Sequence, residues 1–330
     1  MKWNGTATMS RSKKRTVVNM SFAAGFAAGI AVAKKKFGGG GSGEWTFPSH
    51  WPDIPDPEPN QVIMYVEADA GDVAPIIGLY GANFDGGTIN YGDDGYTYDY
   101  PAGYGYNVYH VYQTAGQYII TITAAGNEVY LNALGTNVAF MVGHLIDGSF
   151  GGYNSAENYC RCIRAVKVGS DISLYAHDAR PFDSGRYGRM LVYSEFMGAV
   201  NGIVTTFSGL RALKKIKIGT PPEAFKDDAF SGCNSLEIAD CLQNLMAIPS
   251  NMFASCYALR SAEFPEAVSI GSNAFNVCYS LKTVNAPKLA EITSDEFSSC
   301  YSLQSLTLAD GCSLNGNKFE NCPQLYPKPQ

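Results

Sequence analysis

One spacing constrains the fold of this 330-residue chain more than any other feature. In the second half a cysteine recurs every 22 or 23 residues, at Cys233, Cys256, Cys278, Cys300 and Cys322. A phenylalanine stands three places before each cysteine and a leucine three places after it, as in "FASCYALRSAEF", "FNVCYSLKTVNA" and "FSSCYSLQSLTL". One copy cannot bury its own apolar side, whereas stacked copies place identical positions about 4.8 Å apart. The phenylalanine, cysteine and leucine columns are therefore predicted to be ladders of core contacts.

The period itself is typical of leucine-rich repeats. In "LRSAEF", "LKTVNA" and "LQSLTL" the apolar residues occupy the first, fourth and sixth places, as in the strand of such repeats. The Phe-x-x-Cys-x-x-Leu core followed by Pro265 or Pro287 resembles the BspA-type leucine-rich-repeat family over residues 203–326. The likeness is weaker over residues 135–202. This resemblance implies a solenoid used for surface display and recognition, because such proteins are adhesins and interaction scaffolds of bacteria and related viruses.

The segment from residue 61 to 134 reads as short strands. With 35 glycines and 21 tyrosines the chain favours turns and sheets over long helices. "INYGDDG" at 89–95 and "HVYQTAGQYIITIT" at 110–123 resemble the polycystic-kidney-disease-type (PKD) domain. That resemblance implies an immunoglobulin-like β-sandwich that serves as a spacer or binding module outside cells, without catalysis. Asp93, Asp94 and Asp99 lack the later bidentate glutamate of a calcium loop and are predicted to form a tight turn.

Tyrosines crowd this segment, and some of them lie in the Gly-rich stretch "YTYDYPAGYGY". An exposed tyrosine offers a flat apolar face and a polar tip at a low entropic cost. The candidate contacts for a sugar or protein ligand are Tyr96, Tyr98, Tyr100, Tyr104 and Tyr106. The alternative is that the tyrosines form cross-strand ladders that stabilise the sheet.

The first 36 residues have three possible interpretations. The basic run and the following Ala/Gly-rich stretch fit a signal peptide cleaved after Ala33, a short membrane span, or a helix that anchors the chain in an assembly. In the anchor hypothesis a bulky ridge lies beside small residues, and the contacts are Phe22, Gly25, Phe26, Gly29 and Ile30. Residues 37–60 are Gly/Pro-rich and are predicted to be a linker.

Charge and motifs exclude several functions. Eight basic residues and no acidic residue precede Glu44, while the remaining 16 basic residues stand against 30 acidic ones, a balance that argues against nucleic-acid binding. The nine cysteines include no CxxC pair, and the four histidines are scattered, so we expect no metal site and no cofactor. No catalytic motif is present, so no residue is assigned a catalytic role and no enzymatic activity is expected. The column thiols are predicted to be free and buried, acting as small hydrophobes.

The sequence thus predicts a mainly β fold: an N-terminal anchor helix (1–36), a linker (37–60), a small PKD-like β-sandwich (61–134) and a leucine-rich-repeat solenoid (135–330). The favoured function is a non-enzymatic virion fibre or decoration protein of a bacteriophage, located on the particle surface, since the chain ends in "QLYPKPQ" with no sorting segment. The alternative is an exported bacterial adhesin. The expected partners are a host-surface glycan or protein, and virion proteins or further copies of the chain through residues 17–36, giving a multi-copy assembly. Any membrane contact is expected to be confined to the N-terminal segment.

Overall fold

The computed structural model describes a mainly β protein. The described residues are 45–72, 74, 79–80, 83–100, 110–127, 129–134, 138–139, 162–175, 190–201, 207–220, 224–293, 295–315, 319 and 321–325. The chain divides into two units, Met1–Gly40 and Gly41–Gln330, and every described residue belongs to the second. These residues form strands and turns without an α-helix, which confirms the mainly β prediction. The predicted anchor helix and its contacts Phe22, Gly25, Phe26, Gly29 and Ile30 lie outside the described residues.

An antiparallel sheet forms the first layer of this unit. Strand β1 (Gln61–Ala68) pairs with β5 (Gly116–Asn127), which pairs with β3 (Asn83–Asn90), and β3 pairs with β4 (Tyr98–Tyr100). Five consecutive residues of β1 are buried, because both faces of this strand are covered. Gly92 closes the turn after β3 with φ of 86°, and a Cβ there would lie 2.6 Å from the Ile119 carbonyl oxygen. This turn therefore requires glycine.

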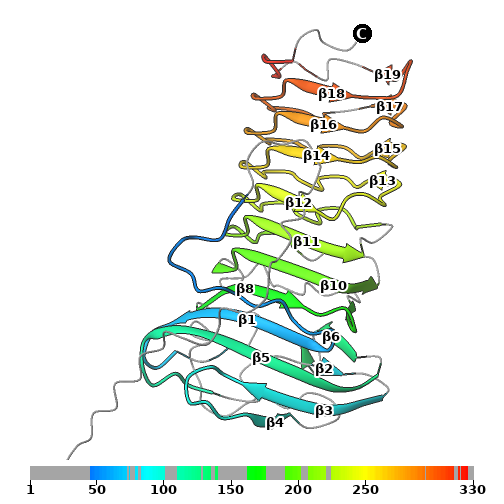
Figure 1. Cartoon of the computed structure of the whole chain (residues 1–330). Coiled ribbons are helices and arrows are strands. Elements are labelled where there is room, and N and C mark those ends of the chain that lie inside the picture. The colour runs from blue at the N-terminus through cyan, green and yellow to red at the C-terminus, as the bar shows by residue number, and fades with distance from the viewer. Residues whose placement is uncertain are drawn as a thin grey trace, which may run out of the picture. The chain divides into compact units, whose positions relative to one another are not determined.

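The same sheet continues into the predicted repeat region. On its other edge β1 pairs antiparallel with β8 (Ile163–Val168), and β8 starts a parallel series with β10 (Tyr193–Asn201), β11 (Lys215–Thr220) and β12 (Ile238–Asp240). The shorter strands that complete this twelve-stranded sheet are β2 (Leu79–Tyr80), β6 (Val129–Leu134), β7 (Val138–Ala139) and β9 (Ile172–Tyr175). Figure 1 shows the continuity from β4 through β1 to β12. The edge of the first parallel coil is thus covered by β1, which removes an exposed template for aggregation.

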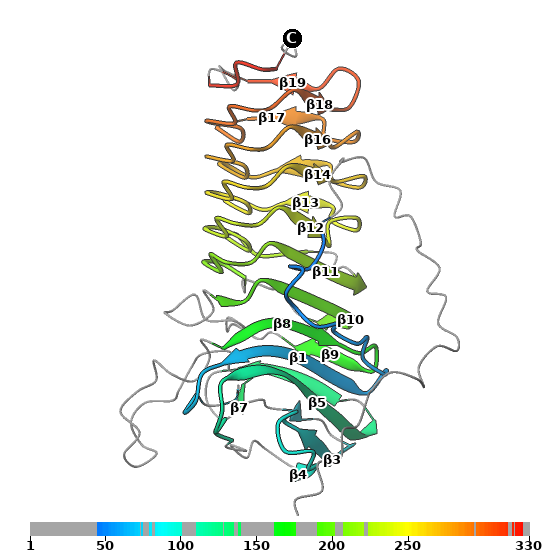
Figure 2. The ribbon, with the colours of Figure 1, turned by 60° about the vertical axis from the view of Figure 1, so that its left-hand side comes forward.

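Beyond β12 the coils are regular (Figure 2). On one side β14 (Ser261–Glu263), β16 (Thr283–Asn285) and β18 (Ser305–Thr307) form a parallel sheet. On another side two short parallel pairs form, β13 (Ala247–Ile248) with β15 (Ser269–Ile270), and β17 (Glu291–Ile292) with β19 (Ser313–Leu314). Ser261, Thr283 and Ser305 are register partners, so the 22-residue sequence spacing equals one coil. The predicted solenoid is confirmed for these coils.

The core of the coils is a stack of phenylalanine rings. Neighbouring rings are nearly parallel, with centroids 5.3 Å apart for Phe230 and Phe253, 5.6 Å for Phe253 and Phe275, and 5.3 Å for Phe275 and Phe297. These four side chains have no exposed surface, and neither do the column leucines from Leu236 to Leu303. The predicted core ladders are therefore confirmed.

The column cysteines have a polar role as well as an apolar one. The Phe253 carbonyl oxygen accepts a 3.0 Å hydrogen bond from the amide of Cys256 and a 3.1 Å bond from the thiol of Cys278 in the next coil. The same thiol-to-carbonyl bond links every successive pair of coils from Phe207 to Cys322. Burial raises the pKa of the Cys233 thiol to about 12. Each thiol therefore satisfies a buried carbonyl as a neutral donor, in addition to filling space.

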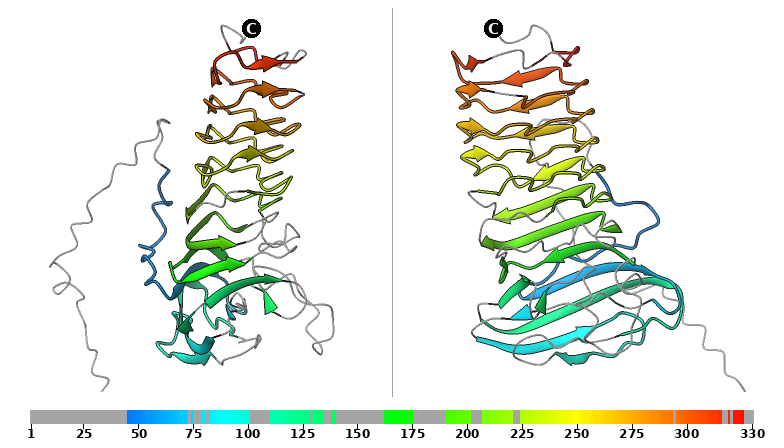
Figure 3. Two further views of the ribbon diagram at one scale, coloured as in Figure 1. Left: turned by 90° about the vertical axis from the view of Figure 1, so that its right-hand side faces the viewer. Right: turned by 180° about the vertical axis from the view of Figure 1, so that it is seen from behind.

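Residues 45–59, here named the strap, cross the outer face of the sheet (Figures 1 and 3). Trp45, Phe47 and Trp51 pack there with Ile54 against a buried cluster formed by Ile63, Tyr65, Ala165 and Tyr193. Lys167 is buried, with 5% of its surface exposed. Its ammonium donates hydrogen bonds to the Ile54 carbonyl at 3.0 Å and to Asp56 Oδ1 at 2.7 Å. This part of the predicted linker is thus packed on β1, β8 and β10.

Candidate ligand-binding surface

A row of exposed tyrosines follows the regular coils. Tyr257, Tyr279 and Tyr301 each come directly after a column cysteine and are 41%, 42% and 49% exposed. Their rings stack, with centroids 5.2 Å apart at 15° for the first pair and 5.4 Å apart at 12° for the second. In parallel coils that stack in register, identical side chains lie about one inter-strand distance apart. Three tyrosines at the same place in successive coils therefore stack on one another. We name these three residues the tyrosine ladder.

The ladder is a preorganised contact surface. Each ring is restrained by its neighbour, so binding costs little side-chain entropy, and each phenol still presents a ring edge and a hydroxyl group. Three residues further along each coil, Arg260, Lys282 and Gln304 are exposed at the start of the strands. Aromatic surface with adjacent cationic and amide groups suits a polar surface ligand such as a glycan or a protein loop.

The tyrosines chosen from the sequence occupy varied environments. Tyr96 is 70% exposed and Tyr98 is 39% exposed, whereas the side chain of Tyr100 and all of Tyr104 and Tyr106 lie outside the described residues. The Tyr98 hydroxyl donates to Asp94 Oδ2 at 2.5 Å, and this hydrogen bond is the main cause that raises the Tyr98 pKa.

Asp94 also accepts a 2.8 Å hydrogen bond from the Tyr96 amide, which is the turn role expected for the aspartates. Its neighbour Asp93 lies 2.8 Å from Nε2 of His110. Both carboxylates are therefore engaged within this turn region.

Other tyrosines of the same segment form the aromatic ladders expected as the alternative. Tyr91 is buried and stacks on His110 with ring centroids 4.2 Å apart. Tyr112 is also buried and stacks on Tyr118 at 4.4 Å. Burial is the main cause that raises the Tyr112 pKa, which keeps its phenol neutral. These stacked rings stabilise the sheet; Tyr91 and Tyr112 are buried and are not accessible as contacts, whereas Tyr118 is half-buried.

The tyrosine ladder was absent from the candidates chosen by sequence. Its signal is the dipeptide Cys-Tyr, which occurs in all three of the most similar copies. A residue that repeats in register but is absent from the core columns must lie on the surface, where a repeated aromatic side chain is unusual. That reasoning would have found all three positions.

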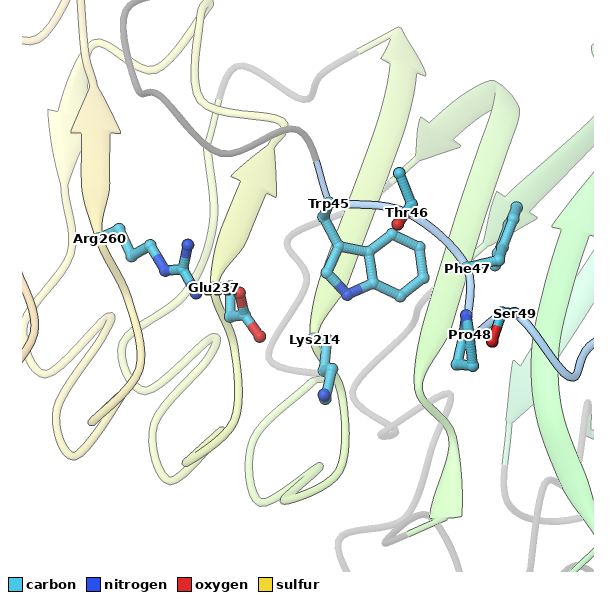
Figure 4. Close-up of a pocket in the computed structure, with 8 residues that line it drawn as sticks. All are labelled: Trp45, Thr46, Phe47, Pro48, Ser49, Lys214, Glu237 and Arg260. Atoms are coloured by element: carbon cyan, nitrogen blue, oxygen red, sulfur yellow. Dashed lines mark ion pairs between the residues drawn. The ribbon is translucent and has the colours of Figure 1, made fainter.

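A pocket lies where the strap meets the coils (Figure 4). Residues 45–49 line one side, and Lys214, Glu237 and Arg260 from three successive coils line the other, enclosing about 490 Å³. Trp45 stacks on Tyr193 with centroids 5.5 Å apart and planes 5° apart. Arg260 and Glu237 form an ion pair at 2.7 Å. The pocket therefore combines an anchored indole with charged groups of both signs.

Comparisons with known proteins identify the repeat region. A family model described as "BspA type Leucine rich repeat region" matches residues 204–326 in six copies. This segment is therefore similar to BspA-type leucine-rich repeats. No curated protein matches the sequence. The family match does not include residues 61–134, so the PKD-like resemblance stays a prediction.

Three solved structures resemble part of the chain. The T. pallidum Leucine Rich Repeat protein is 23% identical over 47% of this chain and 64% of its own, with a TM-score of 0.35. A leucine rich cell surface protein from Faecalibacterium prausnitzii A2-165 is 16% identical over 46% of this chain and 39% of its own, with a TM-score of 0.32. A leucine-rich repeat protein from Bacteroides ovatus ATCC 8483 is 18% identical over 51% and 67%, with a TM-score of 0.22. The match spans less than two thirds of the first two proteins.

No helix among the described residues is long and apolar enough to cross a membrane. Within the same residues, no group of three or more His, Cys, Asp or Glu side chains is placed to hold a metal ion.

Proposed function

We propose that this protein is a non-enzymatic recognition protein, exported and displayed at a cell surface, that attaches to a glycan or protein of another surface through its repeat solenoid. The observation that carries the proposal is the tyrosine ladder, an exposed and preorganised aromatic row on coils whose core is fully occupied. The BspA-type region supports surface display, because the family resemblance implies adhesion and interaction scaffolds.

The virion fibre expected from the sequence stays a prediction, and the repeat family favours the exported adhesin over it. N-terminal sequencing of the native protein distinguishes the two hypotheses. Cleavage after Ala33 supports export, whereas an intact Met1 in a purified particle supports the virion. Assembly through residues 17–36 into a multi-copy complex is part of the virion hypothesis and would be tested by the mass of the full chain in solution.

Binding of the full chain to a printed glycan array and to a panel of intact cells tests the recognition function. We expect saturable binding that weakens about tenfold or more when Tyr257, Tyr279 and Tyr301 are all changed to Ser, because three contact side chains are lost. The matched control is Tyr96→Ser, which removes a tyrosine that is 70% exposed in the turn region before β4. Unfolding midpoints of all variants establish that the fold is kept.

Three results would count against this proposal. Full binding by the triple variant would exclude the tyrosine ladder as the contact surface. Loss of binding in Tyr96→Ser would instead place the contact at the tyrosines predicted from the sequence. Absence of saturable binding to every glycan and cell type would refute adhesion itself.

A further inference from the structure

The pocket between the strap and the coils has an excess of hydrogen-bond donors. Lys214, Glu237 and Arg260 occupy equivalent places, each directly after the first leucine of a coil's strand. Among the described residues the Lys214 ammonium has no ion-pair partner. Arg260 engages Glu237, yet its side chain is 54% exposed and a guanidinium carries five N–H donors. The pocket can therefore accept an anion without breaking the existing ion pair.

The local charge agrees with an anionic ligand. The segment from Phe207 to Thr220 carries four basic residues, Arg211, Lys214, Lys215 and Lys217, and no acidic one. One of these, Lys217, is engaged by Glu195. Arg211, Lys214 and Lys215 thus form a local run of basic residues in a chain whose formal net charge is −6.

The indole of Trp45 adds a flat apolar platform. One face stacks on Tyr193 and Phe47 contacts it edge-on with centroids 5.1 Å apart, so the ring is fixed before any ligand arrives. Figure 4 shows the indole between Phe47 and the side chains of Lys214 and Glu237. A fixed indole packs well on the C–H face of a sugar ring, and Glu237 together with the Thr46 and Ser49 hydroxyls can bond to sugar hydroxyl groups.

We propose that this pocket binds a carboxylate-bearing sugar residue, with the carboxylate on Lys214 and Arg260 and the ring on Trp45. Its volume of about 490 Å³ lies within the usual range for small-ligand pockets, about 300–1,000 Å³. The pocket shares no residue with the tyrosine ladder, so this proposal stands even if the ladder binds nothing.

Titration of the full chain with methyl β-D-glucuronide, followed by calorimetry or NMR, tests the proposal. The uncharged methyl β-D-glucoside and N-acetylglutamate amide are the matched probes, since one lacks the carboxylate and the other lacks the sugar ring. We expect the glucuronide to bind at least about tenfold more tightly than either probe, because both the charge and the ring are recognised.

Three variants locate the site. Lys214→Gln is expected to weaken glucuronide binding about tenfold, because it removes one charge-assisted hydrogen bond. The control Lys288→Gln removes an exposed lysine that is paired with Glu266, away from the pocket, and should leave binding unchanged. Trp45→Ala should abolish binding, and its unfolding midpoint shows whether the rest of the protein is intact. The triple tyrosine variant should bind the glucuronide normally, which separates this site from the adhesion surface.

The proposal is overturned if the glucuronide does not bind, if all three probes bind equally, or if Lys214→Gln and Lys288→Gln behave alike. Equal binding of the glutamate probe and the glucuronide would identify an acidic peptide site instead. Equal binding of the two sugars would show that the cations take no part.

Discussion

Replacing Phe275 by Ala tests the stacked core most severely. This ring has no exposed surface and lies between Phe253 and Phe297, with a further edge contact to Phe264 at 6.0 Å. Truncation of a buried phenylalanine costs about 3–5 kcal/mol. We expect the upper part of that range, because three aromatic pairs are lost and each contributes about 0.5–1.5 kcal/mol beyond buried area.

The coil cannot collapse into the space left by this ring. The Phe275 amide donates to the Glu296 carbonyl oxygen at 2.8 Å, and the Ala274 carbonyl accepts from the Phe253 amide at 2.8 Å. These bonds fix the backbone on both sides of Phe275. Urea unfolding followed by circular dichroism gives the change in free energy from the shift of the midpoint.

Tyr279→Ala in the same coil is the matched control. Its ring is 42% exposed, so its removal should cost no more than about 1 kcal/mol. If Phe275→Ala and Tyr279→Ala lowered stability equally, or if Phe275→Ala cost less than about 1 kcal/mol, the core ladder would not hold the coils together.

Three more perturbations test separate parts of the structure. Burial raises the pKa of the Cys233 thiol to about 12, so the folded protein keeps a proton that the unfolded chain loses above about pH 9. The free energy of unfolding should therefore fall as pH rises from about 9 towards 12, and it should fall less steeply in Cys233→Ala. An equal pH dependence of stability in the two proteins would contradict this linkage. Ser255 adopts φ of 63°, so Ser255→Val should lower stability by about 1–2 kcal/mol, as a thermal melt would show, and an unchanged melt would refute the strain. Lys167→Ala removes the cation that bonds to Ile54 and Asp56, so limited proteolysis within the strap should become faster, whereas unchanged cleavage would show that the aromatic contacts suffice.

The repeat region was predictable because its signal is local and periodic. The spacing of Cys256, Cys278 and Cys300 fixes the coil length, and the structure places register partners at the same 22-residue interval. The polar role of the thiols was missed, because a hydrogen bond to the carbonyl of the preceding coil depends on the stacking geometry.

The junction between the two sheet regions left no such signal. The pairing of Met64 in β1 with Val166 in β8 joins residues far apart in sequence, and no local pattern specifies which strand covers the first coil. The strap was read as part of a linker because it is rich in proline and follows a glycine-rich run, yet Trp45, Phe47 and Trp51 give it an apolar face that packs on the sheet. Composition could not show that these aromatic side chains would be partly buried against the sheet.

Hydroxyl-radical footprinting tests most directly the claim that the tyrosine ladder is the contact surface. It reports which tyrosines a ligand covers, and it requires no amino-acid substitution. The full chain would be oxidised alone and when bound to the cells or glycans that retain it, and modification would be measured for each peptide. The account predicts that Tyr257, Tyr279 and Tyr301 lose reactivity together on binding. Unchanged oxidation of these three rings, with protection confined to Tyr96 or Tyr98, would contradict it.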